Sequence, residues 1–294
     1  MNILPIAKRI QIVSLSVEGM SMRAISRVSD VSINTVTKLL ESVSAACAIY
    51  QDDHLRDINS KRIQCDEIWA FCQSKEKNVA PENKGLLGLG DVYTWTGIDA
   101  DTKLIVSYMV GKRDADYAAL FIGDLASRLA NRVQLTTDGH KPYLQAVEDA
   151  FGGNVDYAML VKHYGPSSNT DQRRHSPSEF AGADKRCISG KPDFARVFTS
   201  FVERQNLTMP MGMRRCTRLT DGFSKKVENL EHAVALHFMH YNFARIHKTL
   251  RVTPAMEAGI SQQVWRIEDI LNLVPAPTAK KRGAYRPRKT LISN

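Results

Sequence analysis

The stretch from residue 61 to residue 72, KRIQCDEIWAFC, constrains the fold most, because it reads as a buried strand with two carboxylates in its middle, Asp66 and Glu67. A buried carboxylate is too costly to keep unless something cationic meets it. Side chains alternate along a strand, so if Cys65 and Glu67 face one side of the sheet, Asp66 faces the other. Only one of the two acids can then face a given site, and alternation alone leaves both open.

Two later carboxylates lie on elements that can join this strand. Asp138 ends the strand-like run VQLTTDG, and Glu203 lies in the helical segment FTSFVERQN. Two divalent ions about 3.5–4 Å apart supply the activated nucleophile and the charge neutralisation that phosphodiester chemistry needs. Such ions are anchored by a few carboxylates on rigid elements. The three elements therefore predict a metal site, although each acid taken singly also fits a turn, cap or surface role.

The positive charge of the chain is concentrated in two blocks. The net charge is +9, yet residues 62–160 hold 14 acidic against 10 basic residues. Residues 161–226 hold 13 basic against 6 acidic residues, and residues 275–294 hold 6 basic residues and no acidic one. Basic flanks around an acidic centre indicate a polyanionic partner, with ordinary surface charge as the alternative.

Cysteine usage and hydropathy argue against several classes of protein. The five cysteines are an odd number without a CxxC pair, which disfavours a disulfide framework and a zinc finger. There is no run of about 18 apolar residues and no basic-then-apolar secretory signal. We therefore expect a cytoplasmic, nucleoid-associated protein without a membrane partner.

Residues 1–60 are expected to form a helix-turn-helix domain and a linker. Three segments, 5–17, 21–30 and 31–46, show helical spacing, and Ser21 and Ser32 are candidate N-caps. Two short helices around a tight turn, the second opening with small polar residues, are typical of this DNA-binding motif; the alternative is a three-helix bundle that contacts another protein. The residues expected to face inward are Met22, Ile25, Val28, Ile33, Val36, Leu39 and Leu40. The residues expected to face the DNA major groove are Ser32, Asn34, Thr35 and Lys38.

Beyond residue 60 the pattern changes to strands and helices in the order β-β-β-α-β-α-β. This order predicts an α/β fold of the ribonuclease H-like type, with a mixed five-stranded sheet and flanking helices. In such sheets, sites lie at the carboxyl ends of the parallel strands. The five strands are expected at 62–72, 92–100, 104–111, 132–139 and 155–164, and the two helices at 115–130 and 141–152.

The rest of the chain divides into an insertion, further helices and a tail. Residues 164–196 form a polar, basic connection within a catalytic domain that spans 61–274. A helix broken near Pro210 and a long helix over 227–250 follow, and the basic tail 275–294 is expected to be disordered. Basic residues expected to line a path for DNA are Arg173, Arg174, Lys185, Arg186, Arg214, Arg215 and Arg218.

Four stretches resemble bacterial insertion-sequence transposases of the DDE type, in particular the InsA/InsB kind within the ribonuclease H-like integrase superfamily. They are QCDEIWAF, LTTDGHKPY, FVERQNLTMPMGMRRCTRLTDGFSK and HYNFARIHKTLRVTPAMEAGI. The resemblance spans nearly the whole chain, and the ERQN stretch is its most specific part. It implies that the catalytic and metal-binding acids are Asp66, Asp138 and Glu203, with Asp66 bridging two Mg²⁺ ions (Mn²⁺ substituting) and Glu67 pointing away. It further implies that Arg204 and Asn206 contact DNA near the scissile phosphate.

The resulting hypothesis is a DNA transposase that binds terminal inverted repeats. It would cleave double-stranded DNA at the element ends and direct the freed 3′-hydroxyl onto target DNA, acting on DNA as a homodimer or higher oligomer. Two alternatives remain. One is a non-catalytic, transposase-derived DNA-binding regulator, and the other is a ribonuclease H-like nuclease of another type.

Overall fold

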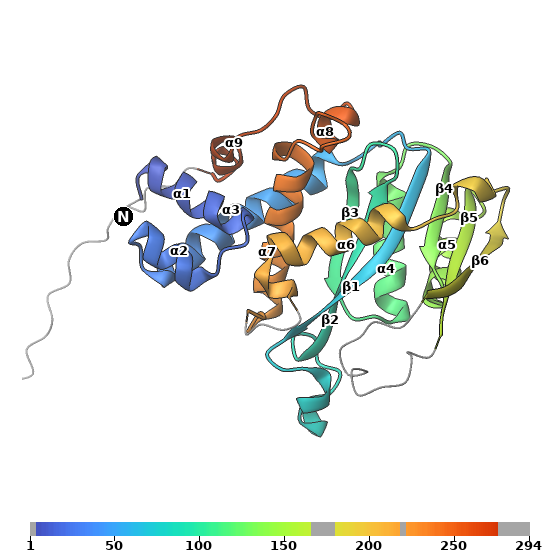
Figure 1. Cartoon of the computed structure of the whole chain (residues 1–294), viewed down its shortest axis with the longest axis horizontal. Helices are drawn as coiled ribbons and strands as arrows, with labels where there is room; N and C mark the ends of the chain where they lie inside the picture. Colours follow the sequence, from blue (N-terminus) through green and yellow to red (C-terminus); the bar gives the residue numbers. More distant parts are fainter. Residues whose placement is uncertain (1–3, 166–179, 218–221, 276–294) are drawn as a thin grey trace, which may run out of the picture.

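The centre of the molecule is a single twisted sheet with helices on both faces (Figure 1). The structure is a computed structural model and describes residues 4–165, 180–217 and 222–275. The strands run in the order β3-β2-β1-β4-β5-β6. Their bounds are β1 Arg62–Cys72, β2 Gly90–Asp99, β3 Ile105–Gly111, β4 Val133–Asp138, β5 Val155–Tyr164 and β6 Phe180–Ser189.

The pairing of β1 with its two neighbours places the carboxylates. β1 runs antiparallel to β2 over its whole length and parallel to β4 over its first half. Cys65 is the last residue of β1 paired with β4, and it lies opposite Thr137. The next residue of each strand is an aspartate, so Asp66 and Asp138 are neighbours at the carboxyl end of β4.

The prediction of five strands was wrong, because a sixth lies inside the segment expected to be a connection. β6 pairs antiparallel with β5 as an edge strand, and almost all of its residues are exposed. Its sequence, FAGADKRCIS, is polar and has no apolar alternation, so only backbone pairing with β5 reveals it. The first five strands and the two helices between them follow the predicted order.

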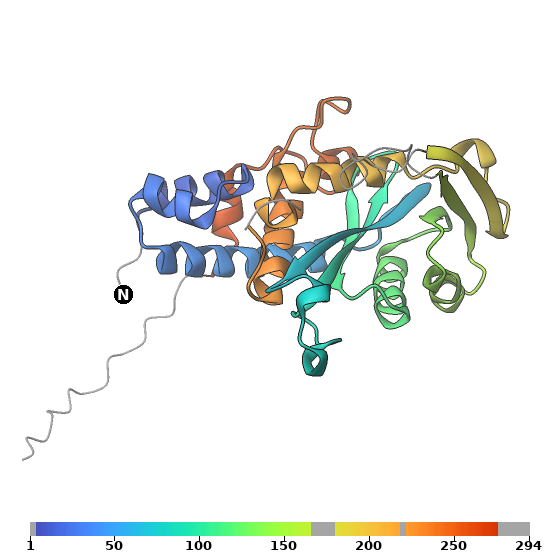
Figure 2. The same cartoon turned by 60° about the horizontal axis from the view of Figure 1, so that its bottom comes forward.

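Two pairs of helices cover the two faces of the sheet (Figure 2). On one face lie α4, Ala115–Arg128, and α5, Pro142–Phe151; on the other lie α6, Ser200–Gly212, and α7, Val227–Met239. α6 does not break at Pro210 but continues for two more residues. A proline in the last turn removes only one backbone hydrogen bond there. α7 ends earlier than expected and passes into a π-helical turn, His240–Ala244.

The amino-terminal segment forms three helices, as predicted. They are α1 Ile6–Val17, α2 Met22–Ser29 and α3 Ile33–His54. Both predicted N-caps are confirmed: Ser21 Oγ accepts from the Ala24 N–H and Ser32 Oγ from the Thr35 N–H. Two residues expected to face inward, Val28 and Ile33, are instead exposed. They lie on either side of the turn between α2 and α3, where none of the described elements buries them.

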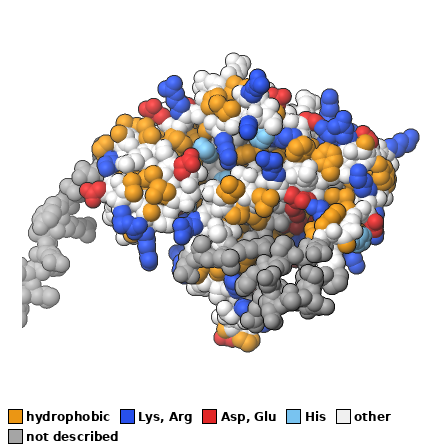
Figure 3. Space-filling view, viewed as in Figure 1, with side chains coloured by type: hydrophobic (Ala, Val, Ile, Leu, Met, Phe, Trp, Pro, Cys, Tyr) orange, Lys and Arg blue, Asp and Glu red, His pale blue; other side chains and the backbone are white. Residues whose placement is uncertain are grey.

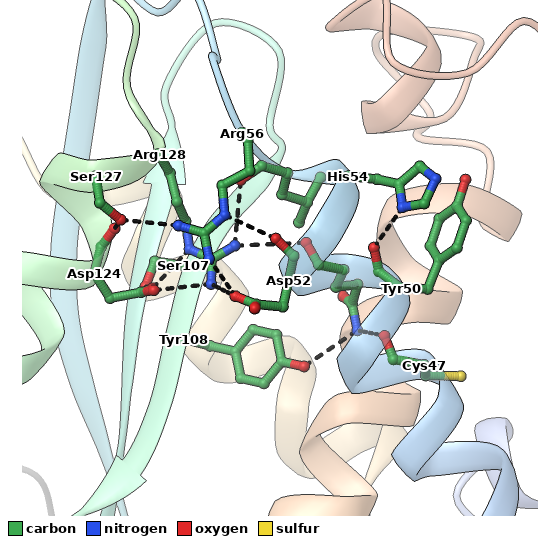
Figure 4. Close-up of polar contacts among 12 residues, drawn as sticks. Cys47, Tyr50, Asp52, His54, Arg56, Ser107, Tyr108, Asp124, Ser127 and Arg128 are labelled. Carbon is green, nitrogen blue, oxygen red and sulfur yellow. Dashed lines mark hydrogen bonds and ion pairs between the residues drawn. The ribbon is translucent and has the colours of Figure 1, made fainter.

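A buried polar network ties α3 to the sheet (Figure 4). The guanidinium of Arg128, at the end of α4, donates to Asp52 on α3 (2.7 Å) and to Asp124 on its own helix (2.7 Å). Gln51 Nε2 donates to the Tyr108 hydroxyl on β3 and to the backbone oxygen of Ala235 on α7, both at 3.1 Å. The orientation of the amino-terminal helices relative to the sheet is therefore fixed by paired groups.

The last described elements fold back on the amino-terminal helices (Figure 1). α8, Pro254–Glu257, follows the π-helical turn, and α9, Ile267–Asn272, packs on α1 and α3. The ring of Trp265 contacts the rings of Tyr50 and Phe243. Short 3₁₀ helices lie at η1 Glu76–Asn78, η2 Pro81–Asn83, η4 Phe194–Arg196 and η5 Arg214–Cys216. Among the described residues, no helix is long and apolar enough to cross a membrane.

Candidate metal centre

Alternation along β1 assigns its two acids to different faces of the sheet. Gln64 Oε1 accepts from the backbone N–H groups of Phe201 (3.0 Å) and Val202 (3.2 Å) at the start of α6. Asp66, two residues on, points the same way, and its Oδ2 accepts from Asn206 Nδ2 on α6 at 3.0 Å. Asp66 therefore faces the helix that carries Glu203, as the alternation argument requires.

Glu67 is directed to the opposite face but stays close to the same site. Its side chain is only 1% exposed, and its Oε2 accepts from Arg113 Nε at 3.2 Å. The buried Tyr143 of α5 lies beside it, and the negative charge of Glu67 helps to raise the pKa of that hydroxyl after the larger effect of burial. Glu67 Oε1 and Tyr143 Oη each lack a hydrogen bond of standard geometry to any described group.

Asp138 lies at the strand end, where it can reach both neighbours. Its Oδ1 accepts from the His140 N–H at 3.0 Å, and its Oδ2 accepts from Arg113 Nη2 at 3.3 Å. One carboxylate oxygen from each of Asp66, Glu67 and Asp138 lies within 4.8 Å of the others. Because Asp138 is the last residue of β4, its side chain is not confined to one face of the sheet. It therefore lies close to both Asp66 and Glu67, which point to opposite faces. Acidic side chains are visible in a recess near the middle of this surface, with basic side chains around them (Figure 3).

The cluster carries more negative charge than the protein compensates. Burial raises the pKa of Asp66 to about 7, and the Asp138 charge adds to the shift. Burial, again with Asp138, raises the pKa of Glu67 to about 7. Arg113 is the one basic side chain ion-paired with this cluster in the described part of the chain. Converging carboxylate oxygens with a deficit of positive charge fit a hard divalent cation such as Mg²⁺ or Mn²⁺.

Glu203 lies near the cluster but is engaged elsewhere. It sits in the first turn of α6, where its Oε1 accepts from Lys162 Nζ on β5 and from the Thr199 hydroxyl. Its negative charge contributes to the raised pKa of Asp66, although less than burial and Asp138 do. The structure thus brings together Asp66, Asp138 and the unexpected Glu67, with the predicted Glu203 alongside and held by a lysine.

Two basic residues of this centre were missed by reasoning from the sequence. Arg113 follows β3 by two residues, and Lys162 lies in β5 just after the buried residues 157–160. A lysine within a buried strand and an arginine just after a neighbouring strand were the available signals. Neither indicates, without the sheet order, which acid the side chain will meet.

The residues predicted to bind DNA lie in several places. Asn34, Thr35 and Lys38 are exposed on the first turns of α3, and the hydroxyl of Ser32 caps that helix. Lys185 and Arg186 are exposed on β6, where Lys185 Nζ donates to the Phe194 backbone oxygen and Arg186 pairs with Asp184. Arg204 is exposed on α6, and Arg214 and Arg215 belong to η5. Arg173, Arg174 and Arg218 lie outside the described residues.

Comparisons with known proteins do not assign this chain to a family. No protein-family model matches the sequence. No curated protein matches it significantly. Among solved structures, the Mos1 mariner paired-end complex with Mn aligns at 14% identity with a TM-score of 0.23, covering 47% of this chain and 54% of that one. The Mos1 strand transfer complex aligns at 13% identity with a TM-score of 0.24, covering 81% of this chain and 77% of that one. At such scores the similarity supports no inference about function.

Proposed function

We propose that this protein is a DNA transposase that cleaves and joins DNA strands at a centre built from Asp66, Asp138 and Glu203. The observation that carries the proposal is the convergence of half-buried, undercompensated carboxylates where β1 and β4 run side by side. The strand order and the resemblance of the QCDEIWAF, LTTDG and FVERQN stretches to insertion-sequence transposases support the same conclusion.

The donor set fits two divalent cations, in keeping with the all-oxygen ligands of this centre. Asp66 and Asp138 would hold one ion, and Asp66 with Glu203 the other. Bound Mg²⁺ or Mn²⁺ would activate a water molecule or a 3′-hydroxyl and stabilise negative charge at the scissile phosphate. The raised pKa values of Asp66 and Glu67 show that the site without a cation holds its charges at a cost.

The remaining polar residues would hold these acids in place. Asn206 donates to Asp66 Oδ2 and fixes the rotamer of that carboxylate. Arg113 joins Glu67 to Asp138, so Glu67 acts through Asp138 rather than on DNA. Lys162 neutralises Glu203, and once that pair opens, its ammonium group is free to contact a phosphate oxygen.

The amino-terminal helices would supply sequence recognition. In a helix-turn-helix, the second helix enters the major groove with its first residues against the bases, and the exposed Asn34, Thr35 and Lys38 occupy that position on α3. The natural target is the terminal inverted repeats of a mobile element. Because two ends must be joined to one target, the active form would be a homodimer or higher oligomer on DNA.

The test is metal-dependent cleavage of DNA that carries the sequences on either side of the coding region. Wild-type protein should cut at the element ends with Mg²⁺ or Mn²⁺ and not with EDTA. Asp66→Asn and Glu203→Gln should each lose cleavage by a factor of 100 or more, while Glu148→Gln, a change of an exposed acid on α5, should cut normally. Full activity of either site variant would overturn the assignment, and sequence-specific binding without any cutting would instead indicate a non-catalytic regulator.

A further inference from the structure

A large groove separates the amino-terminal helices from the segment that follows α6. We call it the junction groove; its volume is about 1180 Å³, and its walls are α2 and α3 on one side and residues 212–215 with 222–237 on the other. Both views of the fold place the end of α6 beside these helices (Figures 1 and 2). The groove is distinct from the carboxylate centre, because none of the acids of that centre lines it.

The charged side chains of this groove are almost all basic. Glu41 on α3 is the only acidic residue in its described lining. Within the described ranges, none of the basic residues forms an ion pair with a carboxylate. The basic residues of the lining are Arg23, Arg27, Arg214, Arg215 and Lys225.

Arg215 is the strongest indication that the groove is built for an anion. Its Nη1 donates to Ser224 Oγ at 2.9 Å, and burial lowers the pKa of its guanidinium. A half-buried cation that has no counter-charge among the described residues is unfavourable, and a phosphate that accepts paired N–H bonds would compensate it. His232 adds a second unsatisfied group, because its buried Nδ1 has no hydrogen-bond partner in the part of the chain that is described.

The opposite wall presents two further cations in a matching arrangement. Arg23 and Arg27 lie one turn apart on α2, and both are exposed. Like charges at this spacing disfavour a helix slightly unless an anion lies between them. In a helix-turn-helix, the first helix crosses the DNA backbone rather than reading bases.

We propose that the junction groove holds the sugar–phosphate backbone of duplex DNA, gripped between α2 and the lining residues Arg214, Arg215 and Lys225 of the opposite wall. The proposal deepens the proposed function, since it makes the catalytic part of the chain a second, sequence-independent contact to the DNA that α3 reads. DNA fits better than an acidic protein segment because both walls offer rows of cations, which match a regularly spaced chain of phosphates.

α6 connects the junction groove with the carboxylate centre, so its length gives the distance between them. Glu203 lies in its first turn and Gly212, its last residue, lines the groove. Nine residues of helix span about 14 Å, which corresponds to about four base-pair steps of 3.4 Å along one strand. For a duplex that runs along α6, the phosphates held beside Gly212 would lie about four base pairs from a phosphate at Glu203.

The test measures binding of a 30-base-pair duplex of random sequence to the full chain, by fluorescence anisotropy in EDTA at salt concentrations from 50 to 200 mM. Two double variants each remove two exposed groove cations: Arg23→Gln/Arg27→Gln and Arg214→Gln/Lys225→Gln. A matched control, Lys77→Gln/Lys84→Gln, removes two exposed cations of the β1–β2 connection. Random sequence is suitable because phosphate contacts carry no sequence information.

Each lost phosphate contact should lower the slope of log K against log[salt] by about 0.9. Over this fourfold range of salt, wild type should therefore lose about 12-fold more affinity than either groove variant, and the control should follow wild type. Unchanged slopes in both groove variants, or no binding of the duplex by wild type, would overturn the proposal. Because EDTA prevents cleavage, slopes that change as expected in a protein that never cuts DNA would keep the groove and refute the transposase function.

Discussion

Replacing Asp66 by asparagine should stabilise the metal-free protein. The folded-state pKa of Asp66 is raised from 3.8 to about 7. Ionisation of this carboxylate therefore does not lower the free energy of unfolding below about pH 4, lowers it increasingly between pH 4 and 7, and lowers it by a constant amount above pH 7. A shift of about three units corresponds to about 4 kcal/mol at pH 8. This figure is already net of the hydrogen bonds from Asn206 and the Glu67 N–H, which lower the pKa of Asp66.

The gain of about 4 kcal/mol should raise the Tm by roughly 6 °C at pH 8 and leave it almost unchanged at pH 4. The assay is thermal unfolding at both pH values, with EDTA or with excess Mg²⁺ or Mn²⁺. Wild type should gain about 2.7 kcal/mol when the ion is present at 100 times its Kd, and Asp66→Asn should lose that response. A variant with a lower metal-free Tm at pH 8, or with an undiminished response to metal, would refute the reasoning.

Three further predictions concern other parts of the molecule. Burial lowers the pKa of His237 from 6.5 to about 3, so the free energy of unfolding should be highest above pH 6.5 and about 2 kcal/mol lower at pH 5. Urea unfolding at pH 7 and pH 5 measures this decrease, which wild type should show and His237→Gln should lack. Arg128→Met removes the buried guanidinium that pairs with the half-buried Asp124 and the exposed Asp52 and should cost about 1.5–3 kcal/mol, whereas Arg56→Met, at a more exposed arginine, should cost under about 1 kcal/mol; equal losses in denaturant melts would contradict the role of the network. Lys162→Met removes the cation that competes for Glu203, and calorimetric titration should show tighter Mn²⁺ binding than in wild type; weaker binding would argue against this competition.

The positions of Asp66 and Asp138 followed from the sequence because they depend on few choices. Hydrophobic periodicity locates β1 and β4, and the strand order makes them parallel neighbours, so the two acids meet whatever the details of packing. The caps at Ser21 and Ser32 were predictable for a similar reason, since a helix N-terminus needs a local acceptor.

The features that were missed depend on long-range packing. β6 has no apolar periodicity, and its strand conformation comes from pairing with β5. The contact of Glu67 with Asp138 goes through Arg113, a residue 46 positions away from Glu67. Val28 and Ile33 are apolar residues that periodicity turns inward, but they remain 52% and 41% exposed in the described part of the chain. Periodicity predicts the face of an element on which a side chain lies, but it does not predict which other element packs against that face.

Strand joining tests the central claim most directly. A labelled DNA end with a free 3′-hydroxyl is mixed with the protein, a target plasmid and Mg²⁺ or Mn²⁺, and transfer of the label to the plasmid is measured. We predict transfer by wild type and by Glu148→Gln, and none by Asp66→Asn, Asp138→Asn or Glu203→Gln. Transfer that persists in any of these three variants, or that proceeds in EDTA, would contradict a metal-dependent centre built from these carboxylates.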